Sequence, residues 1–238
     1  MFSFLYRIAD LNIRINTITN YVPAIGNQFI IDNKCLSDIV ITATEEKIEK
    51  YKEKMPEHLR EIGFCENLCV LNELASEILK FNTFLIHGVS AKINNIGIIF
   101  TGKSGIGKTT HLKLWQELLG EKLVVINGDK SLIRFIDDTP YVFGTPWKGI
   151  ERIGGNESSV LTDICFIEQN QEDIVYEISS DEAFQKILNQ IYIPDDSTKR
   201  IQILTLLDKI LKKCRFWVIK CGTTLNAAEV AYKHITSQ

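Results

Sequence analysis

The sequence has no uninterrupted apolar stretch long enough to cross a membrane, which takes about twenty residues. Its first residues also lack the basic segment and apolar core of a secretory signal, so we expect a cytoplasmic protein without membrane contact. Positive charge is not in excess, because 27 Lys and Arg stand against 30 Asp and Glu and the formal net charge is −3. That balance argues against nucleic acid as a general partner.

The six cysteines form neither a disulfide framework nor a zinc-site pattern. Disulfide frameworks are typical of short exported chains. Cys65 and Cys69 share the spacing of one helix face, but no second pair of ligands follows at zinc-site spacing. We therefore expect buried free thiols and no zinc.

The most informative segment that is present matches the phosphate-binding pattern G-x-x-x-x-G-K-[ST] at every fixed position. Gly102, Gly107, Lys108 and Thr109 occupy those positions. The apolar run before it predicts a buried strand over residues 96–101, and the periodicity after it predicts a helix over 110–119. The motif is informative in this context, between a strand and a helix. The alternative is a glycine-rich turn that binds nothing.

The residue types in this motif follow from the chemistry of phosphate binding. Glycine allows backbone torsions that other residues avoid, and successive amide groups at a helix start then bind an anion. Lys108 would add a point charge for the β- and γ-phosphates, and the hydroxyl of Thr109 would hold Mg²⁺. The residues expected to bind ATP are Gly102, Lys103, Ser104, Gly105, Ile106, Gly107, Lys108, Thr109 and Thr110.

A second candidate lies one strand–helix unit later. The apolar run of residues 122–126 predicts a strand that ends in Asn127-Gly128-Asp129. Nucleotide-binding sheets place metal and catalytic groups at such strand ends, so Asp129 is predicted to be a Mg²⁺ ligand and a catalytic residue. The alternative is an aspartate in a turn, since Asn-Gly-Asp is also a good turn sequence.

Two hairpins are predicted around these motifs. Residues 84–93 should pair with 96–101 across the short turn at Asn94-Asn95, which makes the strand before the loop antiparallel to its neighbour. Residues 131–135 and 141–143 predict a second hairpin. The loop that follows, residues 144–149, includes Lys148, which could reach an anion as a site wall, or it could be a surface turn with Trp147 in the core.

The remaining elements predict an α+β module over residues 1–83 and a nucleotide-binding domain over 84–238. The module would cover an edge of the larger domain or grip a macromolecular substrate. In the module we predict strands over 5–15, 29–31 and 38–42, and helices over 44–54 and 66–81. In the larger domain we also predict strands over 162–167, 172–179 and 216–221, and helices over 181–190, 197–213 and 225–235. The helix 181–190 should be capped by Ser180 or Asp181, and the helix 197–213 should face inward with Ile201, Leu204, Leu207, Ile210 and Leu211.

Several short motifs occur together between residues 87 and 149. They are His87-Gly88, Ser90-Ala91, residues 101–111, Leu114-Trp115, Asn127-Gly128-Asp129-Lys130 and residues 144–149. Together they resemble the kinase domain of HPr kinase/phosphorylase and its PEP-carboxykinase-like relatives. The resemblance is greater to the short HPr-kinase-like proteins associated with peptide modification.

This resemblance implies an α/β fold, a P-loop nucleotide-binding mixed sheet of the HPr kinase/PEP carboxykinase type with a smaller α+β N-terminal module. It implies ATP and Mg²⁺ as cofactors and the side-chain hydroxyl of Ser or Thr on a peptide or protein as the acceptor. In the family a histidine lies near the transferred phosphate, and His87 matches it. The family also has an acidic pair where this sequence has Gly128-Asp129, so Asp129 could be the base, the metal ligand or both.

The expected activity is therefore a Mg-ATP-dependent kinase of the Ser/Thr type. Its catalytic residues would be Asp129, His87, Lys108 and Lys148. Three alternatives stay open: a phosphorylase or pyrophosphate-dependent relative, an ATPase or nucleotide-gated binding module without an acceptor, and an inactive scaffold. The sequence also leaves the oligomeric state open, a homo-oligomer included.

Overall fold

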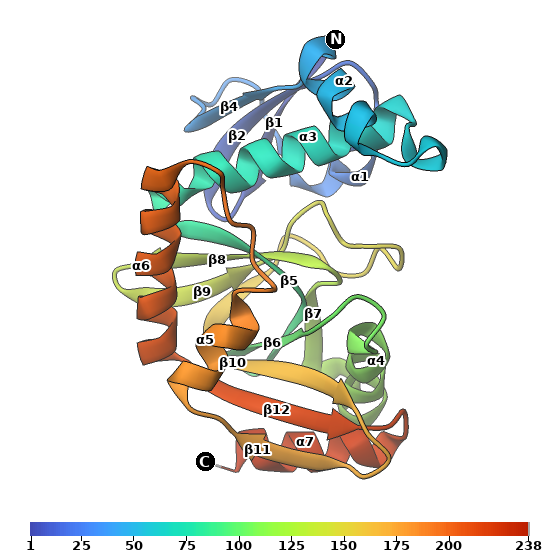
Figure 1. Cartoon of the computed structure of the whole chain (residues 1–238), viewed down its shortest axis with the longest axis vertical. Helices are drawn as coiled ribbons and strands as arrows, with labels where there is room; N and C mark the ends of the chain where they lie inside the picture. The colour runs from blue at the N-terminus through green and yellow to red at the C-terminus, as the bar shows by residue number, and fades with distance from the viewer. Residues whose placement is uncertain (238) are drawn as a thin grey trace.

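The computed structural model describes residues 1–237. In that range the chain forms two β-sheets and seven α-helices. Figure 1 shows a smaller sheet at the N-terminal end, a larger sheet below it, and α6 running along one side of the larger sheet up to the level of α3. The predicted mixed α/β architecture is confirmed, while the division at residues 83 and 84 stays a prediction.

The smaller sheet is built from four strands in the order β3-β1-β2-β4. Its strands are β1 (Phe2–Ile8), β2 (Leu11–Thr17), β3 (Ile30–Ile31) and β4 (Ile39–Thr42). The predicted single strand over residues 5–15 is wrong, because the chain turns at Ala9 and Asp10 and returns as a hairpin. Both turn residues have positive φ, 50° and 58°, as a two-residue type I′ hairpin turn requires.

Three helices pack on the smaller sheet and on one another. They are α1 (Tyr21–Ile25), α2 (Glu45–Lys54) and α3 (Ile62–Glu77). Thr44 caps α2 by accepting a hydrogen bond from the backbone N–H of Lys47, so the predicted helix at 44–54 is confirmed. The predicted helix at 66–81 is also confirmed, although it begins earlier and its last turn, Ile78–Phe81, is a 3₁₀ helix.

The larger sheet has eight strands, most of them in the order β11-β12-β10-β6-β5-β8-β9, while β7 pairs with β5. The strands are β5 (Thr83–Ile93), β6 (Ile96–Thr101), β7 (Leu123–Asn127), β8 (Lys130–Ile136), β9 (Thr139–Phe143), β10 (Ser158–Gln169), β11 (Ile174–Glu177) and β12 (Arg215–Cys221). Both predicted hairpins, β5–β6 and β8–β9, are present. β9 also pairs with the start of β10, so five of the strands close into a ring.

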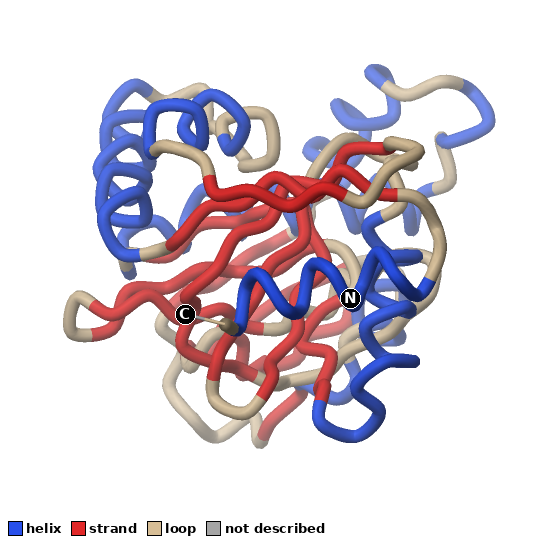
Figure 2. The backbone as a smooth tube through the Cα atoms, turned by 90° about the horizontal axis from the view of Figure 1, so that it is seen from below, coloured by secondary structure: helices blue, strands red, loops and turns tan. Residues whose placement is uncertain are grey.

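Helices cover the larger sheet on both faces, as the end-on view in Figure 2 shows. One apolar core joins the sheet to α5 (Ser180–Ile187) and α6 (Ser197–Lys213), and another joins it to α4 (Lys108–Leu119) and α7 (Leu225–Thr236). A third core unites the N-terminal elements with β5, β8 and β9. The N-terminal part is therefore packed firmly against the sheet and is not a loosely tethered appendage.

The helix bounds were predicted better than the helix faces. Ile201 and Leu204 of α6 are 66% and 48% exposed, whereas Ile203 and Leu206 are buried. Apolar residues lie almost all round this helix, and only the stripe that touches the sheet is covered. The cap of α5 is Ser179, whose hydroxyl accepts from the backbone N–H of Glu182, and not Ser180 or Asp181 as predicted.

The register around β5 determines where the candidate residues lie. β7 ends with Asn127 opposite Ser90, and β8 begins with Lys130 opposite His87. Both strands use the same edge of β5, one after the other. Residues 128–129 therefore cross a short gap beside the middle of β5.

The opposite edge of β5 pairs with β6, whose last residue, Thr101, lies opposite Gly88. β6 and β7 run in the same direction because both are antiparallel to β5. Their carboxyl ends consequently meet at one edge of the sheet, the place where α/β sheets bind ligands. The loop after β6 and the turn after β7 lie on the two sides of His87 and Gly88.

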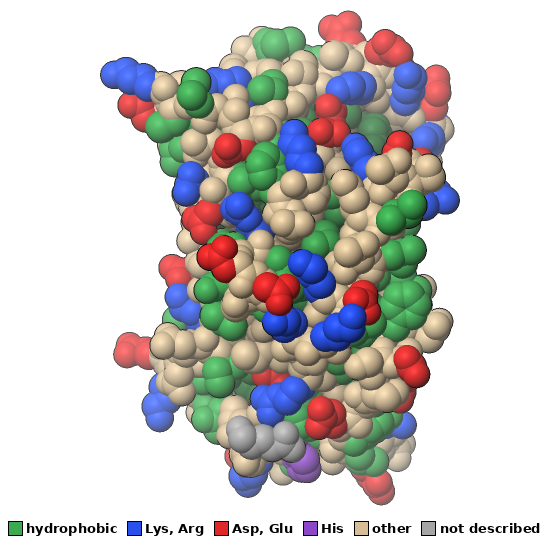
Figure 3. All heavy atoms as spheres, turned by 90° about the vertical axis from the view of Figure 1, so that its left-hand side faces the viewer, with side chains coloured by type: hydrophobic (Ala, Val, Ile, Leu, Met, Phe, Trp, Pro, Cys, Tyr) green, Lys and Arg blue, Asp and Glu red, His purple; other side chains and the backbone are tan. Residues whose placement is uncertain are grey.

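All six cysteines are free, and four of them are buried. Cys35 is exposed and Cys214 is half-buried, so the expectation of buried thiols is wrong for Cys35. No helix in residues 1–237 has the length and apolar character needed to span a bilayer. On the face shown in Figure 3, acidic and basic side chains are intermingled.

Burial of His111 in α4 gives a testable pH dependence of stability. Burial lowers the pKa of His111 from 6.5 to about 4, and its Nε2 accepts a hydrogen bond from the indole of Trp115. Between these two pH values the unfolded chain therefore binds a proton at His111 that the folded chain does not bind. The contribution of His111 to stability is complete above pH 6.5 and is lost as the pH falls towards 4.

We expect the free energy of unfolding to decrease by about 3 kcal/mol over that window through this group, measured by urea denaturation at several pH values. The glutamine of His111→Gln still offers an acceptor to Trp115 but does not titrate. The free energy of unfolding of this variant should therefore lack the decrease that His111 causes in the wild type. An unchanged pH dependence in His111→Gln would show that another group is responsible.

Candidate active site

The glycine loop, residues 102–107, joins β6 to α4 in a conformation that requires glycine. Gly102, Gly105 and Gly107 have φ of 145°, 77° and 108°. A Cβ at Gly105 or Gly107 would meet no atom within 4 Å, so packing does not require glycine there. The loop thus has a backbone conformation that glycine adopts without strain, below open space, and an anion could approach its backbone closely.

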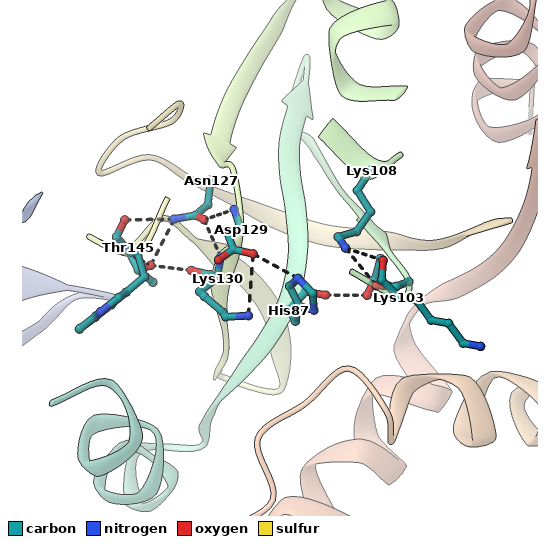
Figure 4. Close-up of polar contacts among 10 residues, drawn as sticks. His87, Lys103, Lys108, Asn127, Asp129, Lys130 and Thr145 are labelled. Atoms are coloured by element: carbon teal, nitrogen blue, oxygen red, sulfur yellow. Dashed lines mark hydrogen bonds and ion pairs between the residues drawn. The ribbon is translucent and has the colours of Figure 1, made fainter. Parts of the chain in front are cut away.

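Lys108 begins α4 and turns its side chain back over the glycine loop. Its Nζ donates to the carbonyl oxygens of Gly102 and Lys103, at 3.0 and 3.1 Å. Burial lowers its pKa, and the carboxylate of Asp129 opposes that shift. Gly107 provides no side-chain cap for the first turn of α4, so amide groups there remain available. Figure 4 shows the ammonium group of Lys108 turned towards the backbone of Lys103.

Asn127 shapes the turn that presents Asp129. Its Oδ1 accepts from the backbone N–H groups of Asp129 and Lys130, at 2.8 and 2.9 Å. Its Nδ2 donates to the backbone oxygen and the hydroxyl of Thr145. The backbone oxygen of Asp129 in turn accepts from the N–H of Gly88 on β5 at 2.8 Å. The backbone of Asp129 is therefore held by hydrogen bonds on both sides.

The side chain of Asp129 lies against a histidine and a lysine. His87 Nε2 is 3.2 Å and Lys130 Nζ is 3.8 Å from its Oδ1. Burial would raise the pKa of Asp129, but the hydrogen bond from His87 and the charges of Lys130 and Lys108 outweigh it and leave the pKa below its usual value. Asp129 is ionised at neutral pH, and both of these contacts are made to its Oδ1, with no hydrogen bond or ion pair at Oδ2 within residues 1–237.

Two glycines beside Asp129 leave no room for a second acid. A Cβ at Gly128 would lie 2.6 Å from the carbonyl oxygen of Lys148 and 2.8 Å from Ile153. Gly149 has φ of 72°, and a Cβ there would approach the Cβ of Asp129 to 3.0 Å. Close backbone packing therefore occupies the space beside Asp129, and the turn holds a single carboxylate.

Two cavities adjoin His87 and Asp129. The first, here called the loop cavity, has a volume of about 750 Å³ and is lined by the glycine loop, His87, the end of β10 and the segment after α5. The second, the module cavity, has a volume of about 610 Å³ and lies between Asp129, helices α1 and α3, and the loop of residues 146–152. His87 lines the loop cavity and Asp129 lines the module cavity, so the hydrogen-bonded pair lies between the two.

The other predicted residues divide between these cavities. Lys103, Ser104 and Ile106 line the loop cavity, and Thr109 is half-buried in the first turn of α4. Lys148 lines the module cavity with Asp129, and its Nζ is 3.4 Å from the backbone oxygen of Gly154. Burial lowers the pKa of Lys148. Lys148 therefore lies on the side of Asp129 away from the glycine loop.

Trp147 combines the two interpretations offered for its loop. It is 5% exposed and its indole donates to Oδ1 of Asn67 on α3 at 2.7 Å. It belongs to the core that joins the N-terminal elements to the sheet. The same residue lines the module cavity. Trp147 is thus a core residue that also forms a wall of the site.

Sequence reasoning gave no role to three residues that the structure places here. Asn127 and Lys130 surround Asp129, and Glu168 lies at the carboxyl end of β10, which is parallel to β6. The carboxylate of Glu168 pairs with Lys186 at 2.8 Å. Glu168 could have been found in the sequence, because it is an acid directly after the predicted strand at 162–167. The sequence did not show that this strand pairs with β6.

Comparison with known proteins adds little to this geometry. No protein family and no curated protein matches the chain. Among solved structures, the Hpr(Ser) kinase/phosphatase from Coxiella burnetii aligns over 65% of this chain and 99% of its own, with 11% identity and a TM-score of 0.27. A TM-score this low supports no conclusion about fold or function. The resemblance to HPr kinases and the peptide-modification subgroup stay predictions from the motifs.

Proposed function

We propose that the chain is an ATP- and Mg²⁺-dependent phosphotransferase acting on a hydroxyl group. One observation carries this proposal: His87 and Gly88 of β5 are flanked by the glycine loop on one edge and by the fixed, ionised Asp129 on the other. A phosphate donor on the loop and an acceptor at the carboxylate would then meet across one strand. Phosphoryl transfer depends mainly on such positioning and on electrostatic stabilisation.

The glycine loop fits a nucleotide by its own features. Its open positive-φ glycines and the uncapped first turn of α4 supply amide donors, and Lys108 supplies a cation. Lys108 now donates to two loop carbonyls, contacts it would exchange for phosphate oxygens. Thr109 and Asp129 are the oxygen ligands we assign to Mg²⁺, which when bound would neutralise charge on the phosphates.

Asp129 has a second proposed role on the acceptor side. Its Oδ1 is engaged by His87, so the open Oδ2 is the oxygen available to a metal or to a hydroxyl proton. His87 orients the carboxylate, and Lys130 balances its charge. A single carboxylate therefore serves the functions that the related kinases divide between two acids, and Lys148 remains close enough to the acceptor side to bind an anionic group there.

The acceptor we propose is Ser or Thr of a peptide or protein. This class rests on the sequence motifs and on the module cavity, which is much larger than a hydroxyl needs. A γ-labelled ATP assay with Mg²⁺ and a pool of Ser/Thr peptides tests it, beside Lys108→Ala. Label in peptide that is lost in the variant would support the proposal.

Other outcomes of that assay favour the alternative functions. Free phosphate formed equally with and without peptide indicates an ATPase. Binding of ATP without turnover indicates a nucleotide-gated module. Transfer from pyrophosphate, or phosphate-dependent removal of phosphate from a labelled peptide, indicates the phosphorylase-like chemistry.

A further inference from the structure

We infer that the module cavity binds a large apolar side chain of the substrate peptide, next to the Ser or Thr that is phosphorylated. The inference rests on the proposed function and specifies its substrate. It is drawn from the walls of this cavity, which combine apolar side chains of the N-terminal part with the polar groups around Asp129.

The apolar wall comes from two helices that lie far apart in the sequence. α1 contributes Tyr21 and Ile25, and α3 contributes Phe64 and Leu68, each pair four residues apart on one helix face. All four side chains are only partly buried. These residues are thus left uncovered at a cavity that opens on the candidate active site, where a side chain of similar character would remove them from water.

The floor of the cavity is rigid. Trp147 is held by its hydrogen bond to Asn67, and its backbone N–H donates to the hydroxyl of Thr145. Thr145 is in turn bound to Asn127, the residue that positions Asp129. The apolar floor and the catalytic carboxylate therefore belong to one hydrogen-bonded unit, so a side chain seated on Trp147 would place its neighbour relative to Asp129.

The charged residues of the cavity determine which net charge a bound peptide can have near its acceptor residue. Lys130, Lys148 and Arg152 line it together with the single acid Asp129. A basic residue near the acceptor would be repelled by this surplus of positive charge. A peptide that is neutral or acidic around its Ser or Thr fits the charges, and an apolar residue fits the opposite wall.

Ile150 supports a macromolecular occupant. It lies on the loop that carries Lys148, lines the same cavity, and is fully exposed, at 101%. Large apolar residues at a cavity rim are typical of surfaces that a partner covers. A peptide offers both parts at once, because alternate residues of an extended chain place their side chains on one face about 7 Å apart.

The test uses a set of short peptides with one Ser, in which a Phe is moved from two positions before it to two positions after it, beside an all-alanine reference. For the full chain, at least one Phe peptide should have a kcat/KM about tenfold above the reference. Leu68→Ala should remove most of that preference, while its affinity for ATP stays unchanged.

Ile150→Ala and Ile201→Ala form a matched pair, since both replace a well-exposed isoleucine and neither should affect folding. We expect Ile150→Ala to lower kcat/KM for the preferred peptide about fivefold, and Ile201→Ala on α6 to leave it unchanged. The inference would be overturned if all peptides were phosphorylated equally well, or if Leu68→Ala and Ile150→Ala kept the peptide preference of the wild type. Either result would still support a kinase.

Failure of the proposed function gives a different result. In that case wild-type protein labels no peptide of the set under conditions in which it binds ATP, and the inference falls with it. Transfer to a small aromatic alcohol but to none of the peptides would support the phosphotransferase activity. It would also show that a peptide is not the occupant of the module cavity, which overturns the inference.

Discussion

Asp129→Asn is expected to lower the rate of phosphoryl transfer by about 10²–10⁴-fold, the usual contribution of a positioned acid–base group. The amide has nearly the volume of the carboxylate, so the backbone contacts to Asn127 and Gly88 can remain. What is lost is the negative charge that faces His87 and Lys130. Single-turnover transfer of γ-label to peptide measures the effect.

A matched control for this variant is Asp208→Asn. Asp208 lies on α6 with its side chain 61% exposed and paired only to Lys212, so transfer should be unaffected. ATP affinity in the absence of Mg²⁺ should also be unchanged in Asp129→Asn, because the glycine loop is intact. Full transfer activity in Asp129→Asn would remove Asp129 from the mechanism and return it to the role of a turn residue.

Lys108→Ala is expected to reduce ATP affinity and transfer together, with transfer falling by about 10³-fold. Within residues 1–237, Lys108 is the only residue whose cationic side chain donates to carbonyl oxygens of the glycine loop, and the variant removes this cation. Its effect is on binding of the phosphates, whereas Asp129→Asn acts after binding. Titration with ATP and the transfer assay on the same preparation separate the two.

Lys212→Ala is the matched control, since Lys212 is a lysine of α6 with its side chain 68% exposed. It should bind ATP as the wild type does. Lys108 is buried, so the thermal unfolding of Lys108→Ala must be compared with that of the wild type. Wild-type ATP affinity in a folded Lys108→Ala protein would contradict the assignment of the loop as a phosphate site.

Much of the fold near the site follows from local sequence signals. The hairpin of β5 and β6 was predicted from the turn Asn94-Asn95, and Asn94 indeed has a positive φ of 56°. The bounds of α6 were predicted from its apolar spacing and are confirmed, and Asp196 caps this helix by accepting from the N–H of Lys199. Such signals act over a few residues, and sequence reasoning reads them well.

The pairings between distant segments could not be predicted in this way. β2 pairs in parallel with β4, and β9 closes a ring with the start of β10, well before the predicted strand at 162–167. The turn at Ala9 and Asp10 was missed because neither residue is the glycine or asparagine that usually marks such turns.

The sequence named the candidate residues of the site but not the shape of the site. The motif identified Lys108 and the strand end identified Asp129, yet the sequence did not show that both flank the same two residues of β5. It also gave no sign that α1 and α3 form a cavity with Asp129. Their contribution depends on tertiary packing around Trp147, which no local pattern encodes.

The most direct test of the central claim is a single-turnover reaction with protein in excess over γ-labelled Mg-ATP and with the Ser peptides present. The claim is that the glycine loop and Asp129 form one site for transfer between two ligands. It predicts label in peptide for the wild type and none for Lys108→Ala. It also predicts bound but untransferred label for Asp129→Asn. Label released only as phosphate, at one rate with or without peptide and in Asp129→Asn alike, would contradict it.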